Sequence, residues 1–148
     1  MQKVKWDDLS EIQQKLLLAA LACRDNAYAP YSNYKVGAAL EDEKGRIFGG
    51  CNVELVTFSR TTHAEGNAID NMVASGGRKI KVLVCVDEDG GSPCGECRQR
   101  IWEFCAGNSN VPIIGVDKTL KNIQIFSIGE LYPYPSGPEI LGIDPSKH

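Results

Sequence analysis

The segment Val82–Val86 constrains the fold more than any other part of the chain. It reads Val-Leu-Val-Cys-Val, an unbroken apolar run within a strand that we expect over residues 81–86. A strand that is apolar on both faces needs a covering layer on each side, which is typical of parallel strands in α/β proteins. The sequence therefore predicts a sheet with helices packed on both of its faces.

The other predicted elements define the arrangement around this strand. Apolar residues at spacings of three and four predict a helix over 8–27. A second helix is predicted over 62–75, where a glycine pair ends it. A third is predicted over 93–106, with a proline near its first turn. The predicted strands are 35–40, 46–52, 81–86, 111–116 and 123–126.

This order predicts a three-layer α-β-α sandwich with a mixed five-stranded sheet. The first two strands are expected to form an antiparallel hairpin, and the later strand-helix-strand units to be parallel and right-handed. No linker or internal repeat interrupts the chain, so residues 1–148 are expected to form a single domain.

Composition and charge exclude several classes of function. The longest apolar run, Leu16–Cys23, is too short to span a bilayer, so no membrane partner is expected. A net charge of −3 argues against nucleic-acid binding, which needs a basic stripe. The N-terminus has no apolar signal core, so we expect a cytoplasmic, reducing environment.

In such an environment, metal or catalytic roles are expected before disulfides for cysteines among the six in the chain. Cys94 and Cys97 are three residues apart at the start of a predicted helix, which puts both sulfurs on one face near its positive end. His63, the only internal histidine, begins another predicted helix. Two sulfurs and one nitrogen leave a fourth coordination position of zinc for water.

Each of these features also has a simpler interpretation. Cys94-x-x-Cys97 alone fits a redox pair or half of a structural zinc site. His63 alone fits a structural histidine, and Thr62-x-x-Glu65 fits a capping box, in which Glu65 would be structural. The remaining cysteines are interpreted as small core residues: Cys23, Cys51, Cys85 and Cys105.

Taken together, two motifs favour catalysis. His63-Ala64-Glu65 and Pro93-Cys94-Gly95-Glu96-Cys97 match the H-x-E and P-C-x-x-C signature of zinc-dependent deaminases. In this interpretation His63, Cys94 and Cys97 hold zinc, which lowers the pKa of a water ligand. Glu65 lies two residues beyond His63 and is placed to carry protons.

The chain resembles the cytidine deaminase family over most of its length. The similar segments occur in the same order and are 27–40, Cys51-Asn52-Val53-Glu54, His63-Ala64-Glu65, 93–99 and 137–142. The resemblance implies one Zn²⁺ per chain and hydrolytic deamination of cytidine or deoxycytidine to uridine or deoxyuridine, in pyrimidine salvage. It also implies a cytidine deaminase-like fold and a homo-oligomer, dimer or tetramer, whose neighbouring subunits complete each pocket.

The resemblance assigns a role to each site residue. A zinc-activated water attacks C4 of cytosine, and Glu65 carries protons to N3 and then to the leaving ammonia. The backbone N–H of Ala64 binds the base, and Tyr34 lies against the pyrimidine. Asn52 and Glu54 bind the ribose, a role that suits an amide and a carboxylate facing hydroxyl groups.

Three departures from the short branch of the family bear on substrate choice. That branch has cysteine at the position of His63 and arginine at the position of Gly66. A zinc centre with two thiolates and a neutral imidazole has no net charge. We therefore expect the zinc centre of this chain not to need that arginine. Residues 55–60 replace a more polar stretch leading into the site. Ser136 replaces a phenylalanine that helps to close the pocket.

Two alternatives to cytidine deamination therefore stay open. One is deamination of another aminopyrimidine nucleoside, such as an antibiotic of the blasticidin type. The other is a non-catalytic, zinc-stabilised module. Such a module would need a fourth protein ligand, for which the candidates are Cys51, Cys85 and Cys105.

Overall fold

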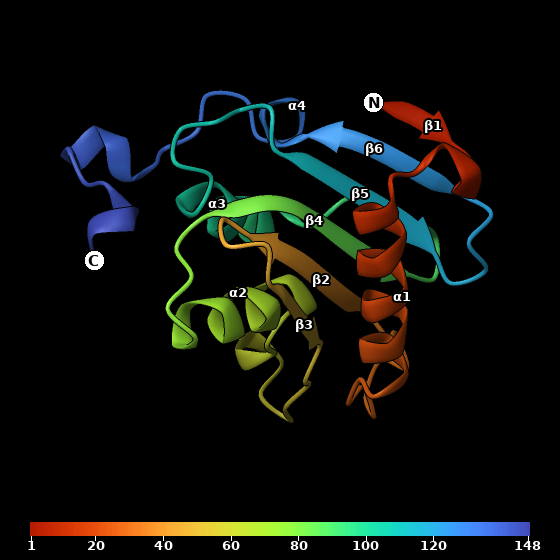
Figure 1. The fold of residues 1–148 in the computed structure, drawn as a ribbon. Helices are drawn as coiled ribbons and strands as arrows, with labels where there is room; N and C mark the ends of the chain where they lie inside the picture. The colour runs from red at the N-terminus through yellow and green to blue at the C-terminus, as the bar shows by residue number, and fades with distance from the viewer.

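The computed structural model describes residues 1–148, which form one six-stranded sheet with helices (Figure 1). The order across the sheet is β1-β6-β5-β4-β2-β3. β4 and β5 pair in parallel, and every other neighbouring pair is antiparallel. The strands are β1 (Gln2–Val4), β2 (Gly37–Asp42), β3 (Ile47–Cys51), β4 (Ile80–Asp87), β5 (Pro112–Asp117) and β6 (Ile123–Ser127).

The helices cover both faces of the sheet, as the sequence predicts. α1 (Glu11–Asp25) packs on one face. The other face carries α2 (Ala64–Ala74), α3 (Gly95–Glu103) and the single turn of α4 (Ile128–Leu131). None of these helices combines the length and apolar content that crossing a membrane requires.

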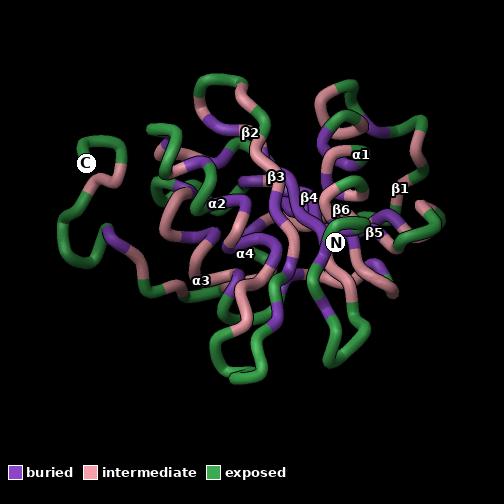
Figure 2. The backbone as a smooth tube through the Cα atoms, turned by 90° about the horizontal axis from the view of Figure 1, so that it is seen from below, coloured by how far each residue is buried: buried purple, intermediate pink, exposed green.

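The core consists of two apolar layers separated by the sheet. On β2, Ala38 and Leu40 face the layer of α2 and α3, whereas Ala39 faces α1. On β4, Leu83 and Val84 divide in the same way. Many of the buried residues lie in these central strands (Figure 2). The alternation explains why the apolar run of β4 is unbroken, since both of its faces are covered.

The sheet has six strands rather than the predicted five. The additional strand, β1, pairs antiparallel with β6, with Gln2 opposite Ile125. It is only three residues long, which is too short to show the alternating pattern on which a sequence prediction depends. The terminal ammonium of Met1 also lies 2.6 Å from a carboxylate oxygen of Glu130, at the end of the sheet.

The first helix begins later than predicted. Ser10 is its N-cap, and the Gln13 backbone N–H donates to Ser10 Oγ at 3.4 Å. The Gln13 side chain accepts in return from the Ser10 N–H at 2.9 Å. This capping box fixes the start of α1 at Glu11. Asp8, which the periodicity assigns to this helix, lies instead in a preceding 3-10 turn.

The backbone of α2 packs closely against the backbone of the edge strand β3. A Cβ atom at Gly50 would lie 2.6 Å from the carbonyl oxygen of Ala64, and it would also collide with the backbone of Ala68. Backbone atoms cannot move aside as a flexible side chain can. The glycine therefore lets the first turns of α2 rest directly on β3, which fixes the position of the residues at the start of α2.

We expect Gly50→Ala to lower the free energy of unfolding by about 1–3 kcal/mol, because the added methyl group overpacks this contact. Urea unfolding of the purified variant measures the loss. Gly95→Ala is the matched control, since a Cβ there would meet no atom within 4 Å. Equal unfolding midpoints for the two variants would contradict the role given to Gly50.

Candidate active site

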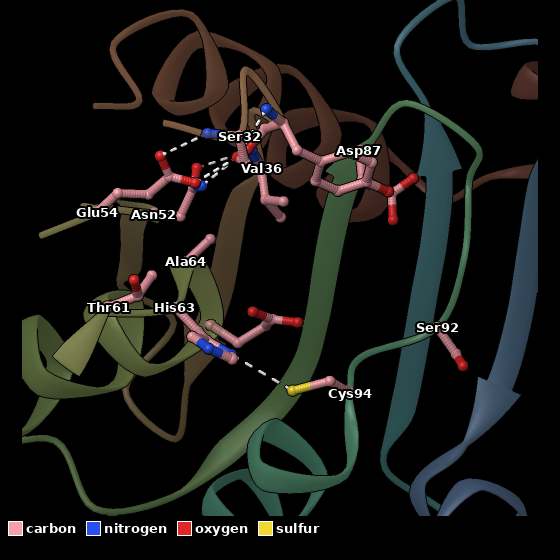
Figure 3. Close-up of a pocket in the computed structure, with 12 residues that line it drawn as sticks. Ser32, Val36, Asn52, Glu54, Thr61, His63, Ala64, Asp87, Ser92 and Cys94 are labelled. Atoms are coloured by element: carbon pink, nitrogen blue, oxygen red, sulfur yellow. Dashed lines mark hydrogen bonds between the residues drawn. The ribbon is translucent and has the colours of Figure 1, made fainter. Parts of the chain in front are cut away.

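A pocket of about 440 Å³ lies where α2 and α3 begin (Figure 3). Most of the predicted site residues line it, namely Tyr34, Asn52, Glu54, His63, Ala64, Glu65 and Cys94. Cys97 lies outside the lining and is only 1% exposed. The other lining residues, which the sequence analysis did not single out, are Ser32, Val36, Thr61, Asp87 and Ser92.

The topology brings these residues to one edge of the sheet. β2 runs antiparallel to both β3 and β4, so β3 and β4 run in the same direction. The helix that follows each strand therefore begins at the same edge. His63 is the N-cap of α2 and Cys94 is the N-cap of α3, and neither cap side chain bonds to its own helix. Both side chains are thus free to face the pocket.

Three potential metal ligands converge at this edge. The donor atoms of His63, Cys94 and Cys97 all lie within 4.8 Å of one another. His63 Nδ1 is 3.3 Å from the sulfur of Cys94 and 3.3 Å from that of Cys97. The structure thus brings together the three residues that the sequence predicts as ligands.

The chemistry and spacing of these donors fit zinc. Bond lengths of ~2.3 Å to sulfur and ~2.0–2.1 Å to nitrogen, at a tetrahedral angle, separate the two donors by about 3.6 Å. The observed separations are close to that value. No fourth His, Cys, Asp or Glu joins the group. Three protein ligands with one open position are typical of catalytic zinc sites and not of structural ones.

The surroundings of Cys97 are unfavourable for an isolated thiolate. Burial raises the pKa of its thiol, and the neighbouring charges of Glu65 and Cys94 raise it further. A cation between the donors reverses this balance, because a coordinated thiol loses its proton to the metal. The N-terminal ends of α2 and α3 add partial positive charge at the same place.

Glu65 belongs to the site and not to a capping box. The N-cap of α2 is His63 and not Thr62, whose backbone pairs with Val53 in a β-bridge. The capping interpretation therefore fails. Glu65 is 5% exposed, lines the pocket, and accepts a hydrogen bond from the Cys97 thiol at 3.3 Å. Its carboxylate thus lies immediately beside the donor group.

Asn52 holds the loop that forms one wall of the pocket. Its Oδ1 accepts from the Val36 N–H and its Nδ2 donates to the Tyr34 carbonyl, both at 2.9 Å (Figure 3). An amide has two donor hydrogens and two acceptor lone pairs. One donor and one lone pair of Asn52 are therefore left over for a ligand.

Glu54 anchors the same loop at an earlier point. Its Oε2 accepts from the backbone N–H groups of Tyr31 at 3.0 Å and Ser32 at 3.2 Å, and its Oε1 accepts from the Ser32 hydroxyl. The Ser32 hydroxyl bond, followed by the two backbone bonds, lowers the pKa of Glu54 below its usual value and outweighs the opposite effect of desolvation. Glu54 is therefore a carboxylate at neutral pH, and Oε1 keeps one free lone pair.

Tyr34 and Asp87 both line the pocket. Burial, followed by the charges of Asp87 and Asp89, raises the pKa of Tyr34 to about 12. Asp87 lies at the carboxyl end of β4, beside its parallel neighbour β5. Ligand sites in parallel sheets concentrate at this end of the strands. The position of Asp87 directly after the apolar run could therefore have identified it as a candidate site residue from sequence alone.

Comparison with known proteins agrees with this geometry. The profile described as "Cytidine and deoxycytidylate deaminase zinc-binding region" matches residues 10–112, which include every site residue described above. The chain belongs to this family. A cytidine deaminase from Sporosarcina psychrophila is 45% identical over 114 residues, covering 76% of this chain and 84% of the relative. Another, from Halalkalibacterium halodurans, is 32% identical over 123 residues, covering 82% and 91%.

The fold of this chain also agrees with a solved structure. The crystal structure of cytidine deaminase from Burkholderia pseudomallei superposes with a TM-score of 0.77 at 35% identity. The match covers 86% of this chain and 100% of that one. The predicted cytidine deaminase-like α/β fold is therefore confirmed, with the extra strand β1 as the correction.

The structure also locates the three sequence departures. The space of a side chain at Gly66 is taken by the guanidinium of Arg100 from α3, so a cation does lie at this point, although it comes from another helix. Ser136 does not line the pocket; its carbonyl accepts from the Gln99 side chain at 2.8 Å. In the segment 55–60, Phe58 is exposed and packs edge-on against Tyr31, with ring centroids 5.5 Å apart.

We expect the purified protein to contain about one zinc ion per chain and Cys97→Ala to lose most of it, because only two protein ligands remain. Metal analysis after dialysis measures the content. Cys105→Ala is the control, since Cys105 is also buried but lies outside the donor group. Full zinc retention by the Cys97 variant would refute this ligand assignment.

Proposed function

We propose that this enzyme is a zinc-dependent deaminase of cytidine and deoxycytidine in pyrimidine salvage, releasing uridine or deoxyuridine and ammonia. One observation carries the proposal: a His63-Cys94-Cys97 donor group with an open position, with the Glu65 carboxylate beside it in a pocket of about 440 Å³. The curated relatives named cytidine deaminase support the same substrate. When bound, zinc lowers the pKa of a water ligand and so supplies a nucleophile at neutral pH.

The protein's own part in the reaction begins with proton transfer. Glu65 takes a proton from the attacking water and delivers it to N3 of the base, and a second transfer then releases the C4 amino group as ammonia. Its burial beside the donor group shields these transfers from bulk water. Ala64 is the first residue of α2, so its N–H has no acceptor within the helix and is available to the base.

Asn52 and Glu54 are proposed to bind the ribose. Each lines the pocket and keeps unused hydrogen-bonding capacity after its contacts to the loop. Those contacts fix both side chains before a ligand arrives, which lowers the entropy cost of binding. Tyr34 also lines the pocket, and its ring is proposed to lie against the pyrimidine.

A second candidate substrate is a basic aminopyrimidine nucleoside, such as an antibiotic of the blasticidin type. The charge of the pocket favours it, because Glu54, Glu65 and Asp87 line the pocket and no lysine or arginine does. Opposite charges attract more strongly in a partly dry pocket than in water. An ammonia-release assay over cytidine, deoxycytidine, cytosine, adenosine and blasticidin-type nucleosides separates the two candidates.

We also propose a homo-oligomer working in the cytoplasm, with residues 1–148 acting as one deaminase domain and neighbouring subunits completing each pocket. Exposed apolar side chains support assembly: Val56 and Phe58 lie in the segment leading into the pocket, and Tyr134 and Leu141 lie in the C-terminal tail. All six cysteines are free, as suits a reducing compartment. Sedimentation velocity tests the assembly.

We expect Glu65→Gln to keep zinc and fold but to lose about 10²–10⁴-fold in kcat, because an amide fills the same space and cannot carry a proton. The assay is cytidine turnover together with zinc content and thermal unfolding. Unchanged turnover in a fully zinc-loaded variant would show that Glu65 is not the proton carrier.

Ribose recognition predicts a difference between two substrates. We expect Glu54→Gln to lower kcat/KM for cytidine by about 10-fold, within the range for a buried charged hydrogen bond. Free cytosine, which has no sugar, should be affected far less. Equal losses for the two substrates would mean that Glu54 acts only through the loop.

Ser32→Ala is the matched control for this measurement. It removes the hydroxyl that bonds Glu54 and keeps the carboxylate. The loop contact is weakened but the proposed ribose acceptor remains. We therefore expect this variant to change cytidine and cytosine turnover by the same factor.

A further inference from the structure

One face of α3 carries both cysteine ligands and an arginine. Cys94, Cys97 and Arg100 follow one another at spacings of three residues, which aligns them along one side of a helix. Arg100 is about 4.5 Å farther along the helix axis than Cys97. It is not among the residues that line the pocket.

The facing side of α2 has a matching arrangement. His63, Gly66 and Asp70 are spaced by three and four residues, so they also share one face. His63 meets the two cysteines at the start of the helices, and Gly66 and Asp70 meet Arg100 one to two turns later. The contact between α2 and α3 thus continues directly from the metal donors to Arg100.

Arg100 fits closely over Gly66. A Cβ at Gly66 would lie 2.9 Å from Cζ of Arg100 and would overlap Nη1, so the guanidinium occupies the space of any side chain at that position. Arg100 Nη2 also donates to Asp70 Oδ1 at 2.6 Å. This ion pair is partly exposed, with 36% of the arginine and 58% of the aspartate side chain accessible. Such pairs contribute little alone, so the fit over Gly66 is the larger constraint.

We propose that Arg100 is a positioning residue for the metal site: its guanidinium, seated over Gly66, sets the spacing of α2 and α3 and thereby the distance of His63 from the sulfurs of Cys94 and Cys97. The inference rests on the zinc site of the proposed function. It assigns to Arg100 a role exerted through the ligands, without contact to the substrate.

Gly66 and Arg100 act together, because the guanidinium needs the space that the glycine leaves. A methyl group at Gly66 displaces the guanidinium, which is the flexible end of its side chain. Gly66→Ala should therefore reproduce the effect of Arg100→Ala, although it leaves the arginine in the sequence. Alanine is also a better helix former than glycine, so a fall in metal affinity in this variant would not be explained by a weaker α2.

The test is a cycle of Gly66→Ala, Arg100→Ala and the double variant, measured by Zn²⁺ affinity against a competing chelator. We expect each single variant to bind Zn²⁺ about 10-fold more weakly, as for changes to residues that support metal ligands. The double variant should be no weaker than either single one. The Co²⁺-loaded forms should show the same altered visible absorption, and Arg100→Lys should recover part of the parent affinity.

Lys15→Met is the matched control, because it also removes the cation of an exposed ion pair but lies on α1, across the sheet. Parent affinity and Co²⁺ spectrum in Gly66→Ala would overturn the proposal, as would losses that simply add in the double variant. If Arg100→Ala does not fold, the comparison of Gly66→Ala with the parent decides the matter. Failure of the parent itself to bind Zn²⁺ would instead refute the proposed function.

Discussion

Strands β3 and β4 run in the same direction, and this forces α2 and α3 to begin at the same edge of the sheet. The shared antiparallel partner β2 lies between them, so neither direction can change alone. Because His63 and Cys94 are the N-caps of the two helices, both ligands lie at this edge. The metal site is thus a consequence of strand direction, and the loops only add the wall that faces the ligand.

Much of this arrangement follows from local sequence pattern. The apolar run of β4 predicts the two covering layers, and the spacing of Cys94 and Cys97 predicts two sulfurs on one helix face. These predictions succeed because each depends on residues close together in the chain. The zinc-deaminase signature supplied what spacing alone could not, namely that His63 belongs with the two cysteines.

The features that sequence could not predict depend on contacts between distant segments. β1 is defined only by its pairing with β6, at the other end of the chain. The simpler interpretation of Glu65 fails because Thr62 pairs with Val53, and His63 rather than Thr62 is the N-cap of α2. Asn52 and Glu54 likewise hold the loop of residues 31–36, and these contacts between distant segments cannot be predicted from a local motif.

The close fit of Arg100 over Gly66 couples changes at these two positions. A larger residue at position 66 displaces the guanidinium when Arg100 is present, whereas a smaller residue at position 100 leaves that space open. The residues at positions 66 and 100 are therefore expected to vary together among relatives of this chain, because each side chain determines the space left for the other.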